Sequence, residues 1–193
     1  SEGIIIIGAS KVSGLIGNYL AKNNRHVVLV DTHESNIARA RELGLEAING
    51  SIYTGDLTDN IELNDVGYLI AMTGNSEINK QAIIKYRDTL GENGSFRLMS
   101  GEEMKNDNDK EVHRNEWFSL THDYVKLSQV VSEYPSIQEF PVQSKAQFLK
   151  LLAHVEEKDN VVALFLKNEK NHLDLITDPE NMEISEGCQL VYL

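Results

Sequence analysis

The sequence predicts an α/β protein: a Rossmann-like parallel sheet with helices on both faces, followed by a small α+β module. Short β-branched runs alternate with helical patterns between residues 3 and 101, which is the order expected of βαβ units. These runs are apolar on both faces, as in strands that are covered on each side. From residue 138 onward, short strands and one helical pattern are separated by polar turns instead.

The elements of the first part follow from hydrophobic periodicity. Strands are expected over residues 3–7, 26–30, 46–48, 68–72 and 95–99. Helices are expected over 11–22 and 35–43, within 56–63, and over 77–90. The first helix has an apolar stripe that would face the sheet, formed by Val12, Leu15, Ile16, Tyr19 and Leu20. Gly44 and Gly91 mark the ends of the second and fourth helices.

The second part begins after a charged segment. Residues 101–116 contain nine charged side chains and almost nothing to bury, which is typical of a solvated loop or linker. We therefore expect one domain over 1–116, ending in this linker, and a second region over 117–193. That region should open with a sixth strand at 117–120 and a helix at 123–133. Its α+β module, expected to be antiparallel, has strands at 138–142, 161–166, 173–176 and 189–193 and a helix at 144–155.

The composition excludes several classes of protein. The chain has 193 residues, 41% hydrophobic and 25% charged, as a folded globular protein does. Its net charge of −12 disfavours nucleic acid as a partner, because a surface of that sign repels phosphates. The single cysteine, Cys188, favours a reducing compartment such as the cytosol.

The start of the chain gives two further expectations. The apolar run over residues 4–9 is far shorter than the ~20 residues that span a bilayer, and no basic segment precedes it. The first three residues lead almost directly into a buried-looking strand, so we expect the chain to be part of a longer polypeptide.

The turn from the first strand into the first helix carries the most information. In a dinucleotide-binding turn, a glycine aims the positive N-terminus of the helix at a pyrophosphate. Gly8 stands at this position, and Asp31 follows 23 residues later, where a carboxylate accepts hydrogen bonds from ribose hydroxyls. The pattern GxGxxG is altered, since Ser10 and Ser13 replace its second and third glycines. The Ser10 hydroxyl can donate to a phosphate instead, and Ser13 is small enough for close packing.

Two interpretations of this turn stay open. One is a nucleotide site, and the other is a Rossmann-type turn kept for architecture after binding was lost. A second register through Gly14 and Gly17 would lie too deep in the helix to form the turn.

Other chemistries lack their sequence patterns. The chain has no GxxxxGK[ST], GxSxG or HExxH string and no pair of cysteines for zinc. No tyrosine has a lysine four residues further on, which disfavours a short-chain dehydrogenase. His122 and Asp123 are adjacent, and we interpret them as the end of a loop that caps the next helix and not as metal ligands.

Four separated segments resemble, in order, the RCK/KTN (TrkA-N) nucleotide-binding domain. They are residues 4–12, 27–31, 50–51 and 69–79, so the resemblance covers about the first hundred residues. This family regulates potassium channels, potassium uptake systems and cation:proton antiporters from the cytosol. The second half is similar, more weakly, to the cytosolic tail that follows such a domain in some sodium or potassium:proton antiporters.

The resemblance implies ligand-binding residues but no catalytic or metal-binding ones. They are Gly8, Ala9, Ser10, Lys11 and Val12 for the phosphates, Asp31 for the ribose, Ser51, Thr73 and Gly74 around the nucleoside, and Thr32 as a further cofactor-binding residue. Ser51 stands where the family commonly has an acidic residue near the adenine. These departures from the family pattern leave the cofactor open between NAD(H), AMP, ADP and ATP, with an empty site as the remaining case.

The resemblance also implies a function. We expect a non-catalytic, nucleotide-binding regulatory domain of a monovalent-cation transporter, above all a sodium or potassium:proton antiporter. Its expected partners are a membrane-embedded transporter domain and a second copy in a homodimer, on the cytosolic face of the membrane. The alternatives are an NAD(P)-dependent oxidoreductase, whose tail supplies a substrate pocket, and a Rossmann-like interaction module with a degenerate site.

Overall fold

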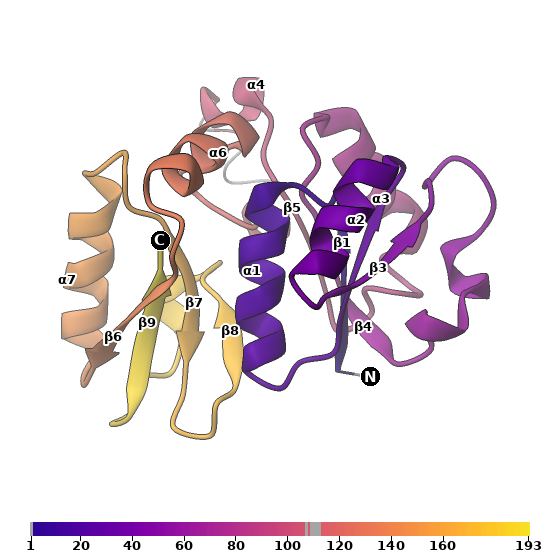
Figure 1. Ribbon diagram of the computed structural model, residues 1–193. Coiled ribbons are helices and arrows are strands. Elements are labelled where there is room, and N and C mark those ends of the chain that lie inside the picture. The colour runs from indigo at the N-terminus through magenta and orange to yellow at the C-terminus, as the bar shows by residue number, and fades with distance from the viewer. Residues whose placement is uncertain (1, 107, 109–112) are drawn as a thin grey trace. The chain divides into compact units, whose positions relative to one another are not determined.

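The computed structural model describes residues 2–106, 108 and 113–193, which separate into two compact units over 1–98 and 99–193. A parallel sheet with helices forms the first unit and a small antiparallel sheet belongs to the second (Figure 1), which confirms the expected fold class. The contacts divide the chain between Leu98 and Met99, ahead of the domain boundary that the sequence places at residue 116. The sequence boundary at 116 stays a prediction.

The first unit is built on five parallel strands in the order β3-β2-β1-β4-β5. The strands are β1 (Gly3–Ile7), β2 (Val27–Asp31), β3 (Glu46–Asn49), β4 (Val66–Ala71) and β5 (Gly94–Arg97). Its helices are α1 (Lys11–Lys22), α2 (Glu34–Glu42) and α3 (Ser76–Tyr86). β1 is buried along its whole length, whereas the edge strands β3 and β5 are partly exposed. The apolar runs therefore mark the centre of the sheet, as expected for strands covered on both faces.

The connection from β3 to β4 differs from the short helix expected within residues 56–63. It holds two 3-10 turns, η1 (Leu57–Asp59) and η2 (Ile61–Leu63). The Asp56 carboxylate accepts a hydrogen bond from the Thr58 backbone N–H at 2.9 Å, and the Asn60 side chain donates to the Leu57 carbonyl at 3.1 Å. These side chains close short turns in place of a continuous helix.

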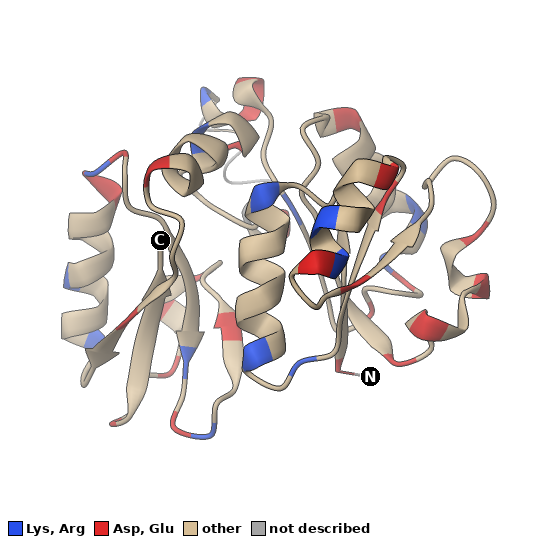
Figure 2. Ribbon diagram, in the orientation of Figure 1, with Lys and Arg blue, Asp and Glu red and all other residues tan. Residues whose placement is uncertain are grey.

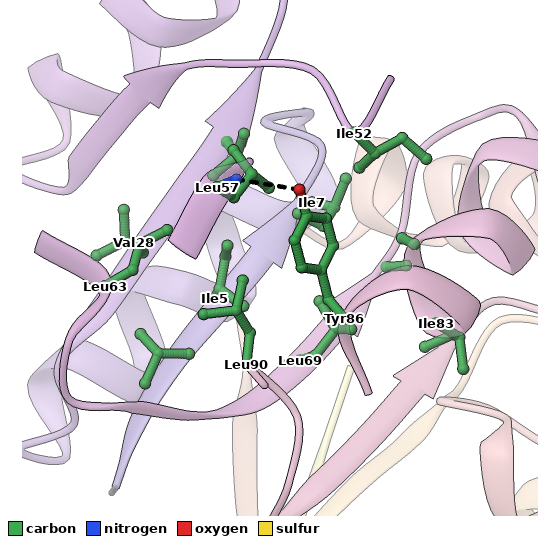
Figure 3. Close-up of a cluster of buried hydrophobic side chains, with 14 residues drawn as sticks. Ile5, Ile7, Val28, Ile52, Leu57, Leu63, Leu69, Ile83, Tyr86 and Leu90 are labelled. Atoms are coloured by element: carbon green, nitrogen blue, oxygen red, sulfur yellow. Dashed lines mark hydrogen bonds between the residues drawn. The ribbon is translucent and has the colours of Figure 1, made fainter. Parts of the chain in front are cut away.

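Helix α3 holds this connection against the core. Tyr86 belongs to a cluster of 14 buried residues from the sheet, α3 and the connection (Figure 3). Its hydroxyl accepts a hydrogen bond from the backbone N–H of Leu57 at 3.0 Å, in a buried environment. The Lys85 ammonium donates to the carbonyls of Ile52 and Gly55, at 2.7 and 3.0 Å. Two consecutive residues of α3 thus fix a loop that carries little regular structure of its own.

The second unit contains an antiparallel sheet in the order β6-β9-β7-β8, as expected for the module. Its strands are β6 (Gln138–Val142), β7 (Ala163–Lys167), β8 (Leu173–Leu175) and β9 (Cys188–Tyr192). The helical segments are α4 (Gly101–Met104), η3 (Arg114–Glu116), α6 (Tyr124–Glu133), α7 (Lys145–Glu156) and η4 (Pro179–Asn181). Phe148 and Leu152 of α7 pack against a cluster that includes Val142, Leu166 and Leu190 of the sheet.

The strand predicted at residues 117–120 is wrong. Trp117 makes only an isolated bridge, and the chain then bends. The cause is the Ser119 hydroxyl, which accepts hydrogen bonds from the backbone N–H groups of Thr121 and His122, at 3.3 and 3.1 Å. Such local side-chain bonds offer the backbone an alternative to a sheet.

The expected loop over residues 101–116 also begins differently, because α4 occupies its first four positions. The Ser100 hydroxyl accepts from the Glu103 N–H, while the Glu103 carboxylate accepts from the Ser100 N–H. This reciprocal pair is a capping box, which starts a helix. Residues 107 and 109–112 of the expected linker lie outside the described part of the chain.

The Tyr86 contact gives a prediction for stability. Tyr86→Phe leaves the buried N–H of Leu57 without its acceptor, and we expect a loss of about 1–3 kcal/mol in the free energy of unfolding. Chemical denaturation measures it. Tyr53→Phe is the control, since that side chain is mostly exposed and its loss should stay within about 0.5 kcal/mol. Equal effects of the two changes would contradict a role for the Tyr86 hydroxyl.

His122 gives a second prediction, because it is buried in the neutral form. Its Nε2 donates to the Asp159 carbonyl at 2.8 Å, so its Nδ1 accepts from the Thr121 hydroxyl at 2.7 Å. Burial lowers the pKa of the imidazole below 6.5, and the charge of Lys126 lowers it further, against the opposing effect of the Asp159 carbonyl. The unfolded chain therefore binds this proton more readily than the folded one.

We expect the second unit to lose stability progressively as the pH falls below 6.5, whereas His122→Gln should flatten this dependence. The measurement is denaturation at several pH values, followed by the fluorescence of Trp117, the only tryptophan. The replacement His172→Gln, on an exposed histidine of the same unit, should keep the slope of the unchanged protein. If the stability of His122→Gln depended on pH as steeply as that of the unchanged protein, this assignment would be refuted.

Candidate nucleotide site

Three turns meet at one edge of the parallel sheet, after the carboxyl ends of β1, β2 and β4. β1 pairs with both of the other strands. The Gly8 N–H donates to the Val30 carbonyl at 2.7 Å, and the Met72 N–H donates to the Ile7 carbonyl at 3.0 Å. Ligands of open α/β sheets bind outside the carboxyl ends of the strands, so this edge is the candidate site.

Gly8 occupies the tightest point of this edge. Its φ of 103° lies in a region that side chains rarely adopt. A Cβ atom there would stand 3.1 Å from Cγ2 of Thr73 and 3.2 Å from the carbonyl oxygen of Met72. Glycine is therefore required both by the backbone and by the neighbouring turn, and the structure brings two of the expected site residues, Gly8 and Thr73, into contact distance.

The N-terminus of α1 follows directly. Ser10 is its N-cap: the Ser10 hydroxyl accepts from the Ser13 N–H at 3.2 Å. The N–H groups of Lys11 and Val12, the first two helical residues, have no carbonyl partner within the helix, and the helix dipole favours an anion beside them. Lys11 is exposed and adds a positive charge. The Val12 side chain is buried, so Val12 can contact a ligand only through its backbone N–H. Figure 2 shows blue at both ends of α1, where Lys11 and Lys22 lie.

The small residues further along α1 serve packing. Ser13 is fully buried, and Cβ atoms on Gly14 and Gly17 would stand 3.2 Å from the side chains of Leu43 and Leu29, respectively. Both glycines lie inside the helix. This confirms that the register through Gly14 and Gly17 does not form the turn.

Asp31, the last residue of β2, is hydrogen-bonded to the turn itself. Its Oδ2 accepts from the Ala9 N–H at 2.8 Å and from the Asn36 side chain at 3.2 Å, and its Oδ1 accepts from the His33 N–H at 2.9 Å. Partial burial raises the pKa of this carboxyl, but the hydrogen bonds from Ala9, His33 and Asn36 outweigh it and hold the pKa below its ordinary value. Asp31 is therefore an anionic acceptor next to the turn, as ribose hydroxyls require.

Helix α2 contributes two residues that the sequence analysis missed. The Arg39 guanidinium donates to the Ala9 carbonyl and to the Asn36 side-chain oxygen, at 3.1 Å in both cases. It places a second positive charge at the turn, beside the Asp31 carboxylate. The available signal was the spacing of Asn36 and Arg39, three residues apart and so on one face of the helix.

A third missed residue, Asn79 of α3, holds the turn after β4. It is only 2% exposed. Its side-chain oxygen accepts from the Thr73 N–H at 2.9 Å and from the Thr73 hydroxyl at 2.7 Å, and its amide donates to the Thr73 carbonyl at 3.1 Å. A polar residue at a helix position that faces the core was the signal for such a role. Asn79 thus fixes the residue that contacts Gly8.

The remaining expected site residues lie at the same edge or in its turns. The Gly50 N–H donates to the Asp31 carbonyl at 3.0 Å, so the segment with Ser51 leaves β3 beside the end of β2. The Ser51 hydroxyl accepts from the Tyr53 N–H at 3.1 Å and closes its own turn. Thr32 and Gly74 are exposed. Contact of these residues with a ligand stays a prediction.

Asp123 caps a helix, as the sequence analysis interpreted it. Its carboxylate accepts from the Lys126 N–H at 3.0 Å, at the start of α6. Across the described ranges, no group of three or more His, Cys, Asp or Glu side chains is placed to hold a metal ion. None of the helices described is long and apolar enough to cross a membrane.

The family comparison matches the first unit. Residues 4–94 fit the model of the TrkA-N domain, a stretch that runs from β1 to the first residue of β5 and includes every turn of the candidate site. A search of curated proteins gives no match for the chain.

Solved structures share the fold at low identity. The NAD(P)-binding domain of an exopolyphosphatase-related protein from Archaeoglobus fulgidus is 16% identical, with a TM-score of 0.50, over 70% of this chain and 99% of its own. The GsuK RCK domain is 13% identical, with a TM-score of 0.50, over 99% of this chain and 43% of its own. The TrkA-N domain of the inner membrane protein ybaL from Escherichia coli is 21% identical, with a TM-score of 0.39, over 57% of this chain and 96% of its own.

The first two similarities establish a Rossmann-like fold, and the family match extends over the segments that carry the resemblance. Residues 4–94 of this chain are therefore similar to the TrkA-N domain and have a Rossmann-like fold.

Proposed function

We propose that the first unit, which contains the TrkA-N-like residues 4–94, binds a nucleotide at the edge formed by the Gly8, Asp31 and Thr73 turns. The observation that carries this proposal is the Gly8 turn, which starts α1 against the Thr73 turn and hydrogen-bonds to Asp31. In it, the N–H groups of Lys11 and Val12 at the start of α1 and the Lys11 ammonium face the phosphates. Gly8, Ala9 and Ser10 form the turn around the phosphates, and Asp31 and Thr32 face the ribose. Ser51, Thr73 and Gly74 flank the nucleoside.

The charge of Asp31 favours NAD(H) among the candidates. An anionic carboxylate accepts hydrogen bonds from a ribose with free hydroxyls and repels a 2′-phosphate, which disfavours NADP(H). The name of the similar Archaeoglobus fulgidus domain, NAD(P)-binding, supports a dinucleotide. AMP, ADP and ATP present the same adenosine and phosphate groups and are outcomes of the binding test below.

We extend the proposal to regulation of a monovalent-cation transporter, a sodium or potassium:proton antiporter, on the cytosolic side of the membrane. The match of residues 4–94 to the TrkA-N model and the fold shared with the GsuK RCK domain support it. A ligand that binds one arrangement of a homodimer more tightly than another shifts the attached transporter by that difference in affinity. No chemical step is required of the chain.

A specific observation favours a second candidate, an interaction module with a degenerate site. The hydroxyls of Ser10 and Ser51 both accept hydrogen bonds from their own turns. A chain that has replaced ligand contacts by internal ones in this way would dimerise without binding a nucleotide.

Nucleotide binding is tested by thermal unfolding with NADH, NAD, NADPH, AMP, ADP and ATP. A ligand at 100 times its dissociation constant adds about 2.7 kcal/mol, which raises the melting temperature by roughly 5 to 11 °C. Lys11→Glu should reduce this shift, because it reverses the charge beside the phosphates. The matched control is Lys22→Glu, at the opposite end of the same exposed helix face. Absence of any shift would favour the interaction module.

Regulation is tested in membrane vesicles that contain the transporter and this chain. The nucleotide that shifts the melting temperature should change the cation flux, and Lys11→Glu should reduce that change. A flux that is indifferent to every nucleotide would refute the regulatory proposal while leaving the binding result intact.

The contribution of Asn79 is tested by Asn79→Ala. Thr73 loses the acceptor of its N–H, so we expect the domain to lose about 1–3 kcal/mol of stability and to bind the nucleotide more weakly. Lys80→Ala, at the next position of α3, should leave stability within about 0.5 kcal/mol and affinity unchanged. Chemical denaturation and a binding isotherm on the folded protein separate the two effects. Unchanged affinity in Asn79→Ala would show that the Thr73 turn is not part of the site.

A further inference from the structure

A histidine lies between two carboxylates at the opposite edge of the sheet, where the strands begin. His26 stands directly before β2, Glu46 is the first residue of β3, and Asp65 stands directly before β4. The His26 Nε2 atom lies 2.9 Å from a Glu46 oxygen, and its Nδ1 atom lies 2.8 Å from Asp65 Oδ2. We call these three residues the His26 clamp.

The clamp joins the starts of the three strands β2, β3 and β4. β1 lies between β2 and β4 in the sheet, so the contact of His26 with Asp65 crosses β1. Gly3, the first residue of β1, makes the crossing possible: a Cβ there would stand 3.0 Å from the Asp65 carbonyl oxygen and 3.1 Å from Asp65 Oδ2. The start of β1 is hydrogen-bonded to both neighbouring segments. The Gly3 N–H donates to the Asp65 carbonyl at 3.0 Å, and the Ile4 N–H donates to the His26 carbonyl at 2.8 Å.

The two carboxylate contacts of His26 depend on whether its imidazole carries a second proton. The two carboxylates approach different ring nitrogens, and both nitrogens donate only when the imidazole is protonated. A neutral imidazole has one donor, so its other nitrogen presents a lone pair to a carboxylate oxygen. Loss of the proton therefore turns one of the two attractive contacts into a repulsive one.

We propose that the His26 clamp is a proton-operated switch, which closes the amino edge of the sheet when His26 is protonated and loosens it when the proton leaves. The switch lies at the other end of the strands from the candidate nucleotide site and does not depend on nucleotide binding.

The charges around His26 support this assignment. The hydrogen bond with Glu46 raises the pKa of the imidazole, burial opposes it, and Asp65 raises it again, so that the pKa lies above 6.5. The neighbouring Arg25 is paired with Glu2 at 3.1 Å, at the same edge. One third of the His26 side chain is exposed, which gives the proton direct access to water.

The sign of the effect follows from these directions. Because the folded protein binds the His26 proton more tightly than the unfolded chain, its stabilisation is complete below pH 6.5 and is lost as the pH rises through the folded pKa. This is opposite to the effect of His122 in the second unit, which loses stability in acid.

The experiment combines two readings on the full chain by NMR: the titration of each imidazole, and the hydrogen-exchange protection of the Gly3 and Ile4 amides. We expect His26 to titrate above 6.5. As the pH rises from 6.5 through the folded pKa of His26, the protection of the two amides should fall. The expected total fall is about tenfold for each pH unit by which that pKa exceeds 6.5. Protection is corrected for the intrinsic pH dependence of exchange.

Four variants complete the test. His26→Gln should remove the pH dependence of protection, and Glu46→Gln and Asp65→Asn should each lower the pKa of His26. The control His154→Gln changes an exposed histidine of α7 and should leave both readings unchanged. The proposal is overturned if His26 titrates at or below 6.5, or if protection in His26→Gln follows the same pH dependence as in the unchanged protein.

Discussion

The close approach of Gly8 to the Thr73 turn is the constraint on which the candidate site depends. β1 is the central strand of the sheet, and Gly8, at the start of its turn, has no room for a side chain. The turn is then held from three sides: by the Asp31 carboxylate at the Ala9 N–H, by the Arg39 guanidinium at the Ala9 carbonyl, and by Asn79 through Thr73. A substitution that widens the turn would therefore disturb the start of α1 and both neighbouring turns together.

The electrostatics of this edge differ from those of the chain as a whole. A net charge of −12 repels anions at long range, yet the start of α1 combines helix N–H groups with Lys11 and Arg39. Asp31 adds one negative charge at the position where a ribose would lie. The arrangement suits a ligand that has phosphates at one end and neutral hydroxyls next to them, as the proposed nucleotide does.

The pKa values of His26 and His122 shift in opposite directions, for reasons that lie in burial and charge. His122 is buried with a carbonyl and a hydroxyl as partners, so the folded state favours the neutral ring. His26 is one-third exposed between two carboxylates, so the folded state favours the cation. The contribution of His122 to stability is therefore lost as the pH falls, and the contribution of His26 is lost as the pH rises through its folded pKa.

The sequence by itself determined the parallel sheet, the helices α1, α2 and α3, the antiparallel module and the edge on which Gly8, Asp31 and Thr73 meet. Hydrophobic periodicity fixes which segments are buried, and the carboxyl ends of parallel strands share an edge. It did not reveal Asn79 and Arg39 as supports of the turns, nor the Ser119 bonds that prevent a strand at 117–120. The His26–Asp65 contact, between residues 39 positions apart, exists only because β1 lies between β2 and β4 with a glycine at the crossing. Such contacts are decided by the tertiary structure, because they depend on which strands become neighbours and on the space between them.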